Sequence, residues 1–167
     1  MPTKKLFIFR HGKSDWTAKF KTDHERPLAE RGIQAAQLMG EHLTKIEQQP
    51  ELVVSSTAKR ALDTAHLAHE FGQWDCEIKS SRNLYLASVE EALEQIHAVS
   101  SDIERLMIVA HEPMCSELIS ELCFGAHVKF PTAAVACLKF RVDEWRQVKA
   151  NKGQLTWLLT PKVLSKK

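Results

Sequence analysis

Short apolar runs alternate along the chain with longer segments in which apolar residues recur at helical spacing. Short runs bounded by turn residues are typical of buried β-strands. The predicted strands cover residues 6–9, 52–55, 106–110, 134–140 and 155–159, and a weaker candidate covers 77–79. Each run is followed by a segment whose period changes from that of a strand to that of a helix or a turn.

The first two intervening segments have the period and the end signals of α-helices. Residues 29–46 carry apolar side chains at intervals of three and four, which predicts a helix with one buried face. After the second strand, Ser56 or Thr57 is expected to cap a helix that ends at Gly72.

Two further helices have clear start signals. The tetrapeptide "SVEE" that begins at Ser88 has the form of a capping box, and Pro113 suits the first turn of a helix that reaches Leu122. The alternation of strands and helices predicts an α/β fold of three layers, α/β/α, with a mostly parallel central sheet. Because a short connection joins the last two strands, one of them is expected to be antiparallel at an edge.

Composition narrows the classes of function. The chain has 167 residues, of which 44% are apolar and 26% charged, and this fits one domain over residues 1–167. A net charge of +2 gives no indication of nucleic-acid binding, and no apolar stretch is long enough for a membrane span. The four cysteines form no CxxC pair and the N-terminus lacks a cleavage signal, so we expect reduced thiols in a cytoplasmic protein.

Reactive side chains follow three of the predicted parallel strands. The first strand ends in Arg10-His11-Gly12, the second is followed by Arg60, and the fourth is followed by His111. Because ligands collect at the carboxyl ends of strands in such sheets, we expect these residues to meet.

The chemistry of this set fits a phosphate group. Guanidinium groups match phosphate oxygens in a bidentate manner, and Gly12 would let the backbone approach a ligand closely. A histidine held neutral by its arginine neighbours can attack phosphorus, while the second histidine donates a hydrogen bond to a phosphoryl oxygen. Positioning and charge stabilisation are what phosphoryl transfer mainly requires, so no metal and no cofactor are expected.

Five motifs, in order, resemble those of the histidine phosphatase superfamily, also called the phosphoglycerate mutase-like family. They are "FIFRHGKSDW", "ERPLAERGIQAA", "SSTAKRALDTA", "VAHEP" and "FPTAAVACLKF", and they extend from about residue 5 to residue 140. Within that family the chain is most similar to the short phosphohistidine phosphatases of the SixA type. One departure is Ala29, which stands where family members commonly have a capping threonine or serine.

The resemblance implies a role for each candidate residue. His11 would be the residue that is phosphorylated, Arg10 and Arg60 would hold the phosphoryl group, and His111 would complete the pocket. Arg26 and Ser14 would line the pocket further, although Arg26 could instead pair with Glu30 or Asp23, and Ser14 could bond only its own turn. For three other residues or pairs we expect no functional role: the His66 and His69 pair lacks a third metal ligand, His24 has no partner, and Tyr85 is interpreted as a packing residue.

The type of phosphate depends on whether the site contains a proton donor. An alkoxide leaving group needs an acid, whereas the nitrogen leaving group of a phosphoramidate does not. Glu90 and Glu91 fall in the predicted capping box, which favours phosphohistidine, with Glu112 and Asp15 as alternative acids.

The resemblance also implies that the partner is a phosphorylated protein, such as the histidine phosphotransfer domain of a phosphorelay. We expect the enzyme itself to be a monomer. Two other interpretations stay open. One is a phosphatase for small phosphate esters or for another phosphoprotein. The other is a phosphate-binding module without catalytic activity.

Overall fold

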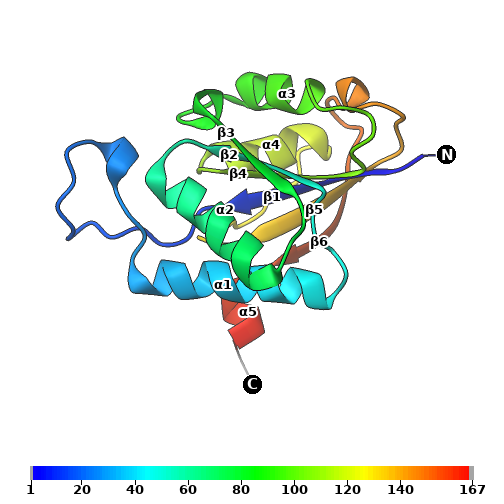
Figure 1. The fold of residues 1–167 in the computed structure, drawn as a ribbon. Helices are drawn as coiled ribbons and strands as arrows, with labels where there is room; N and C mark the ends of the chain where they lie inside the picture. The colour runs from blue at the N-terminus through cyan, green and yellow to red at the C-terminus, as the bar shows by residue number, and fades with distance from the viewer. Residues whose placement is uncertain (1, 166–167) are drawn as a thin grey trace.

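The computed structural model describes residues 2–165, and within them one six-stranded sheet forms the centre of the molecule. The strand order is β3-β2-β4-β1-β5-β6 (Figure 1). The strands are β1 (Lys4–Arg10), β2 (Leu52–Ser56), β3 (Glu77–Ser81), β4 (Arg105–Ala110), β5 (Val135–Phe140) and β6 (Gln154–Leu159). All six correspond to predicted runs.

Most of the sheet is parallel, as the alternating pattern predicts. β1 pairs with β4, β4 with β2, and β2 with β3, each in parallel. β5 runs antiparallel to β1, and the edge strand β6 runs antiparallel to β5. The reversed strand therefore lies one position inside the edge, because the long connection from β4 through the following helix returns the chain beside β1.

Helices cover both faces of the sheet, which confirms the three-layer arrangement (Figure 1). Leu6 and Ile8 of β1 face one hydrophobic core, and Phe7 and Phe9 face the other. Burial on both faces explains why the run in β1 is continuously apolar. The first core is covered by α3 (Val89–His97) and α4 (Met114–Leu122), and the second by α1 (Glu30–Lys45) and α2 (Lys59–Gly72). A short α5 (Pro161–Ser165) packs against α1.

The weak signal at residues 77–79 has a structural reason. β3 forms one edge of the sheet and none of its residues is buried, so it needs no apolar run. Its pairing with the buried strand β2 defines it instead.

The capping predictions have mixed outcomes. Ser88 and Glu91 form the predicted capping box of α3, and α1 begins after Ala29 without a side-chain cap. The prediction that Ser56 or Thr57 caps α2 is wrong: the N-cap residue is Ala58, and no side chain caps this helix. Both hydroxyl groups make tertiary contacts at the candidate site instead. None of the helices in residues 2–165 is both long enough and apolar enough to cross a membrane.

Candidate active site

Two histidines meet because they follow neighbouring strands. His11 follows β1 and His111 follows β4, and in the parallel pair of strands Arg10 is in register with Ala110. The backbone N–H of His11 also donates to the carbonyl of Ala110 at 3.1 Å. The centroids of the two imidazole rings lie 5.1 Å apart, so the structure brings together the two histidines that the strand-end pattern singles out.

The ring of His11 is fixed in one orientation. Its Nδ1 atom lies 2.6 Å from the carbonyl oxygen of Gly12, which can only accept, so Nδ1 carries the proton. The lone pair is therefore on Nε2. Burial lowers the pKa of His11 to about 4; the Gly12 hydrogen bond opposes this shift, and the nearby arginine charges add to it. His11 is thus an uncharged imidazole with a free nucleophilic nitrogen at neutral pH.

The ring of His111 is oriented by Ser56. Nε2 of His111 lies 2.8 Å from Ser56 Oγ, and that oxygen already accepts the backbone N–H of Ala58 at 3.2 Å. Among the described residues the Ser56 hydroxyl contacts no other acceptor, so we assign it as the donor to Nε2, which places the His111 proton on Nδ1. That Nδ1 is buried without a hydrogen-bond partner among residues 2–165. Burial, followed by the proximity of His11, lowers the pKa of His111 to about 3.

Three guanidinium groups surround the histidines. Arg10 ends β1 and donates from Nη1 to the carbonyl of Phe130 at 2.9 Å. Arg60 lies in the first turn of α2, and Arg26 lies in the connection between β1 and α1; both are at least 94% buried. The charges of all three lower the pKa of His11, in the order Arg60, Arg10, Arg26. The Nε atoms of Arg10 and Arg60 are buried and have no partner within the described part of the chain.

Ser14 and Arg26 belong to the same site. Nε of Arg26 donates to Ser14 Oγ at 3.0 Å, so Ser14 does not merely bond its own turn. Nη1 of Arg26 also pairs with Asp23 at 2.5 Å, one of the two alternatives for this arginine. The other alternative is wrong, because no ion pair joins Arg26 to Glu30 within residues 2–165.

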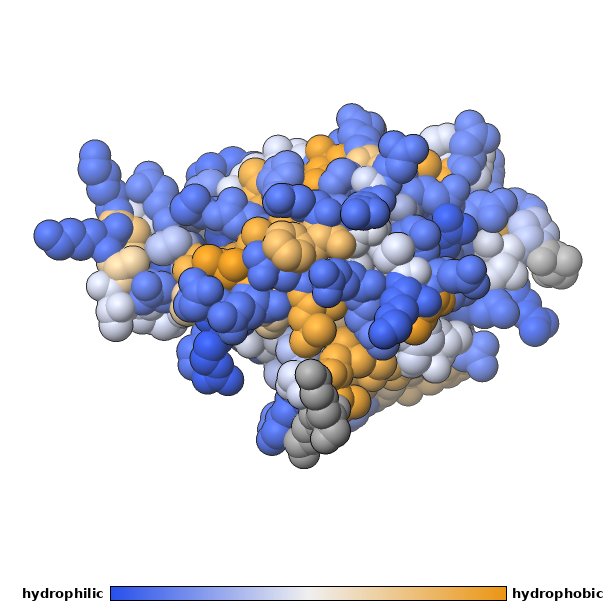
Figure 2. Space-filling model, turned by 60° about the horizontal axis from the view of Figure 1, so that its bottom comes forward, coloured by the Kyte–Doolittle hydropathy of each residue, from blue (hydrophilic) through white to orange (hydrophobic). Residues whose placement is uncertain are grey.

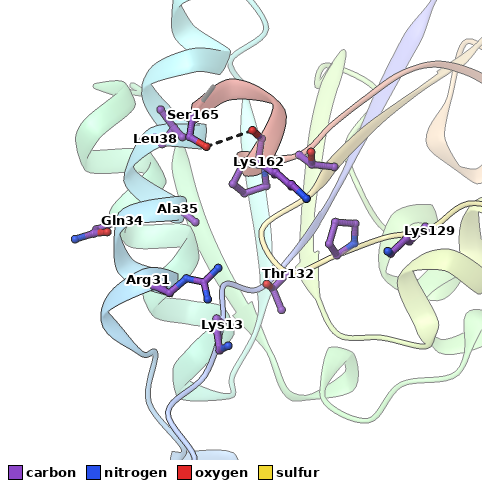
Figure 3. Close-up of a pocket in the computed structure, with 12 residues that line it drawn as sticks. Lys13, Arg31, Gln34, Ala35, Leu38, Lys129, Thr132, Lys162 and Ser165 are labelled. Atoms are coloured by element: carbon purple, nitrogen blue, oxygen red, sulfur yellow. Dashed lines mark hydrogen bonds between the residues drawn. The ribbon is translucent and has the colours of Figure 1, made fainter. Parts of the chain in front are cut away.

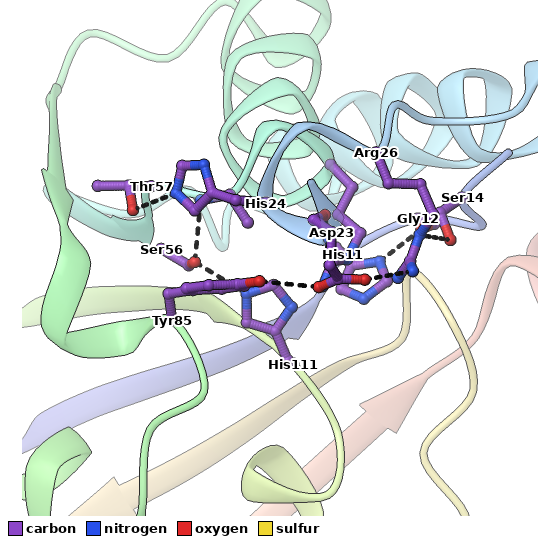
Figure 4. A network of polar contacts seen from close by, with 12 residues as sticks. His11, Gly12, Ser14, Asp23, His24, Arg26, Ser56, Thr57, Tyr85 and His111 are labelled. Carbon is purple, nitrogen blue, oxygen red and sulfur yellow. Dashed lines mark hydrogen bonds and ion pairs between the residues drawn. The ribbon is translucent and has the colours of Figure 1, made fainter. Parts of the chain in front are cut away.

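Asp23 links the arginines to an aromatic ring. Its carboxylate accepts from Arg26, from Nη2 of Arg60 at 3.1 Å and from the hydroxyl of Tyr85 at 2.9 Å (Figure 4). Its backbone carbonyl accepts from Nη1 of Arg60 at 2.7 Å. Burial opposes ionisation of Asp23, but the Tyr85 hydrogen bond and the two arginine charges outweigh it and lower the pKa.

Sequence reasoning missed the aromatic side of the site. The Tyr85 ring lies 5.7 Å from the His111 ring and 4.8 Å from the His24 ring. Nε2 of His24 in turn lies 2.8 Å from Thr57 Oγ1. Tyr85 is therefore more than a packing residue, and His24 does have a partner. No pattern in the sequence marks these residues, because each comes from a separate connection.

The loop after His11 depends on close backbone packing. A Cβ atom on Gly12 would lie 2.7 Å from the carbonyl oxygen of Gly32, so only glycine fits there. The N–H of Gly12 donates to Thr64 Oγ1 of α2 at 3.0 Å. Thr64, which the sequence analysis did not identify, thus holds the loop that orients His11.

The carboxylates considered as proton donors point elsewhere. Glu91 caps α3, Glu112 accepts the backbone N–H of Ser116 at 2.7 Å, and Asp15 accepts from Thr17 at 2.7 Å. Glu90 is exposed in the first turn of α3. His69 contacts the carbonyl of Cys76, and no cluster of three or more potential metal ligands occurs among residues 2–165.

Similarity to known proteins extends over most of the chain. The family model for the "Histidine phosphatase superfamily (branch 1)" matches residues 6–85. An uncharacterized protein of Mycobacterium tuberculosis is 32% identical over 163 residues, which are 92% of this chain and 99% of that protein. The solved structure of the protein assigned as phosphohistidine phosphatase SixA from Agrobacterium tumefaciens matches with a TM-score of 0.80 and 25% identity, over 96% of this chain and 99% of that chain. The protein histidine phosphatase SixA, solved in complex with tungstate, matches with a TM-score of 0.83 and 23% identity, over 96% and 99% of the two chains.

Proposed function

The chain belongs to the histidine phosphatase superfamily, and on that premise we propose that this phosphatase hydrolyses phosphohistidine carried by a protein. His11 is the nucleophile in this proposal. Its Nε2 forms a bond to phosphorus while the N–P bond of the substrate breaks, and the electron pair of that bond returns to the substrate imidazole. Water then attacks the phosphorus, the Nε2–P bond breaks and returns its electron pair to His11, and inorganic phosphate leaves as the attacking water gives up a proton to the solvent.

The observation that carries this proposal is the state of the His11 ring. The 2.6 Å contact with the Gly12 carbonyl leaves the lone pair on Nε2, and a pKa of about 4 keeps the ring uncharged at neutral pH. A neutral imidazole among guanidinium groups is of little use for folding, whereas it is a ready nucleophile for phosphorus.

The neighbouring residues have complementary roles in the proposed reaction. Arg10 and Arg60 hold the phosphoryl oxygens, and Arg26, supported by Ser14, adds a third positive charge. The Nδ1 proton of His111, fixed by Ser56, is available as a hydrogen-bond donor to a phosphoryl oxygen. These groups stabilise the charge of the transferring phosphoryl group without needing to move.

The carboxylates support an N–P bond as the substrate. Asp23 is the carboxylate that contacts the site arginines, and its lowered pKa keeps it ionised, so it has no proton to give. An alkoxide leaving group would need such a proton. The imidazole of the substrate leaves in its neutral form when its second ring nitrogen carries a proton, so it needs no acid from the enzyme.

Exposed apolar side chains beside the site support a protein substrate. Trp16 lies over the guanidinium of Arg26 at 3.6 Å from its ring centroid and is 69% exposed. Leu86, which follows Tyr85, is 75% exposed. A protein that presents phosphohistidine at the site would cover these two side chains, whereas a small phosphate ester would leave them exposed. A histidine phosphotransfer domain has the required chemistry, since it presents phosphohistidine on its surface.

The proposal is tested by comparing leaving groups. Wild-type protein is expected to release phosphate from phosphohistidine and phosphoramidate faster than from p-nitrophenyl phosphate or alkyl phosphates, and to retain acid-labile phosphate when quenched. His11→Ala should lose both turnover and label, because the nucleophile is gone. A preference for alkyl esters would contradict the proposal in favour of an ester phosphatase, and tight phosphate binding without turnover would indicate a binding module.

A further inference from the structure

A hollow lies beside the active site, on the side of α1 and α5. It has a volume of about 930 Å³ and is bounded by α1, α5 and the segment 129–132 (Figure 3). Ala35 and Leu38 of α1 and Pro131 form a half-buried apolar floor. We call this hollow the basic groove, because its charged lining residues are Lys13, Arg31, Lys129 and Lys162.

The basic groove is free of compensating negative charge. No Asp or Glu lines it, and none of its four cations forms an ion pair with any residue in the described range 2–165. The whole chain has 23 lysines and arginines against 21 acidic residues, so without these four it would have 19 against 21. The groove lining thus carries a local charge of +4, whereas the whole chain carries a net charge of +2. Figure 2 shows the face of α1 and α5, where hydrophobic patches are surrounded by hydrophilic residues.

The residues of the basic groove are connected through the backbone to the loop after His11. Lys13 is two residues beyond His11, and Lys129 and Pro131 flank Phe130, whose carbonyl holds Arg10. The N–H of Ala133, just after the groove segment, donates to the carbonyls of Arg10 and His11 at 3.1 and 3.0 Å. The groove residues are therefore backbone neighbours of Arg10 and His11, so a chain bound at the active site would have the groove next to it.

We propose that the basic groove binds an acidic segment of the phosphoprotein substrate, next to its phosphohistidine; this inference rests on the proposed function. A single phosphate or carboxylate would fill little of the volume and would leave the apolar floor uncovered. A peptide segment with Asp or Glu at several positions and apolar side chains between them matches both the separated cations and the floor. Binding there supplies the selectivity for one protein that a phosphoryl site alone lacks.

The binding test uses a fluorescent, unphosphorylated peptide that alternates Glu or Asp with Leu. Wild-type protein should bind this peptide, and Arg31→Glu/Lys129→Glu should weaken binding by about tenfold or more through lost attraction and added repulsion. Arg31→Glu introduces an acid in the first turn of α1, where the helix dipole favours it, so the fold should be preserved. The control, Lys149→Glu/Lys152→Glu, makes the same change in charge at exposed residues before β6, and its affinity should stay within about twofold of wild type, since neither lysine lines the groove.

The outcome of this test does not depend on catalysis, so it separates the two proposals. Equal binding of the peptide by both double variants, or no binding by wild type, would overturn the groove proposal even if phosphohistidine is hydrolysed. Binding of inorganic diphosphate that depends on Arg31 and Lys129, without peptide binding, would also overturn it and indicate a small-anion site.

Turnover provides the second measurement. For phosphohistidine peptides with acidic flanks, Arg31→Glu/Lys129→Glu should raise KM about tenfold with kcat little changed, and kcat/KM for phosphoramidate should be unchanged. A parallel loss with phosphoramidate would contradict a separate docking role. Absence of all phosphohistidine turnover would contradict the proposed function. The peptide-binding result would then still decide whether the groove binds acidic segments.

Discussion

At the scale of single residues, the site is defined by hydrogen bonds that assign protons. The Gly12 carbonyl accepts from Nδ1 of His11, and the Ser56 hydroxyl contacts Nε2 of His111, so both rings carry their proton on Nδ1 and opposite nitrogens remain free. One ring is therefore left with a free lone pair and the other with a free N–H group. Burial lowers the pKa of both rings and keeps them uncharged at neutral pH, so the free lone pair and the free N–H group can coexist on rings whose centroids lie 5.1 Å apart.

The state of His11 predicts an unusual pH dependence. Protonation removes the lone pair of Nε2, and because the pKa is lowered from 6.5 to about 4, the reactive neutral form persists as the pH falls through 6.5 and is lost only near 4. NMR titration of the ring of His11 should give a midpoint near pH 4, with exposed histidine rings as the internal reference. Single-turnover labelling of the protein should lose its rate over the same range. A midpoint for His11 near 6.5 would contradict the buried, cationic environment.

Asp23 illustrates a second effect at this scale. Its carboxylate and its backbone carbonyl take the Nη atoms of Arg60, and the same carboxylate pairs with Arg26. These contacts hold both guanidinium groups in place beside the histidines. Asp23 thus acts as a positioning residue for the arginines, and its ionised state suits that role.

At the scale of elements, the connection between β1 and α1 depends on two glycines. Gly12 and Gly32 lie back to back, and the carbonyl of Lys13 accepts the N–H of Ala29 at 2.8 Å. α1 therefore begins directly against the loop that orients His11. This hydrogen bond and the close packing hold the start of α1 in the absence of a capping side chain at Ala29.

This packing predicts the effect of Gly32→Ala. Helix propensity alone would stabilise the protein by about 1 kcal/mol, since alanine replaces glycine within α1. The new Cβ would, however, overlap the backbone of Lys13, so we expect a net loss of about 1–3 kcal/mol in the free energy of unfolding. Urea denaturation measures this change, with Gln34→Ala on the exposed face of α1 as a control that should change stability by less than about 0.5 kcal/mol. A more stable Gly32→Ala protein would show that the contact is not tight.

At the scale of the whole molecule, the site joins segments from distant parts of the chain. Its residues follow β1, precede α1, begin α2, precede α3 and follow β4. The sheet places these segments at the carboxyl ends of its parallel strands, and the two hydrophobic cores on its faces hold the strands in place. A ligand that contacts several of the segments therefore binds the folded chain and not the unfolded one.

This linkage predicts stabilisation by vanadate, an oxyanion that resembles phosphorus during transfer. At a concentration of 100 times Kd, vanadate should add about 2.7 kcal/mol to the free energy of unfolding. For a chain of this length, that corresponds to a rise in Tm of roughly 5–10 °C in a thermal scan. Arg60→Ala should lose most of the shift, whereas Arg31→Glu/Lys129→Glu should keep it. The reverse result would place the oxyanion in the basic groove.

Much of the fold could be predicted from the sequence because its signals are local. Apolar runs such as residues 6–9 identify strands by period, and the capping box at Ser88 identifies the start of α3. The strand-end rule then brings His11 and His111 together, since β1 and β4 are parallel neighbours. Candidate site residues that directly follow a predicted strand can therefore be recognised from the sequence alone.

The sequence by itself determined the layers of the fold and the set of histidines and arginines, because periodicity and strand ends involve residues close in the chain. Tertiary structure alone decided the positions of Asp23, Thr64 and Tyr85 and the formation of the basic groove. Asp23 and Tyr85 are 62 residues apart, and Gly12 and Thr64 are 52 apart. Side chains on separate connections have no periodic relation to one another, so only the packing of the elements that carry them sets which of them meet.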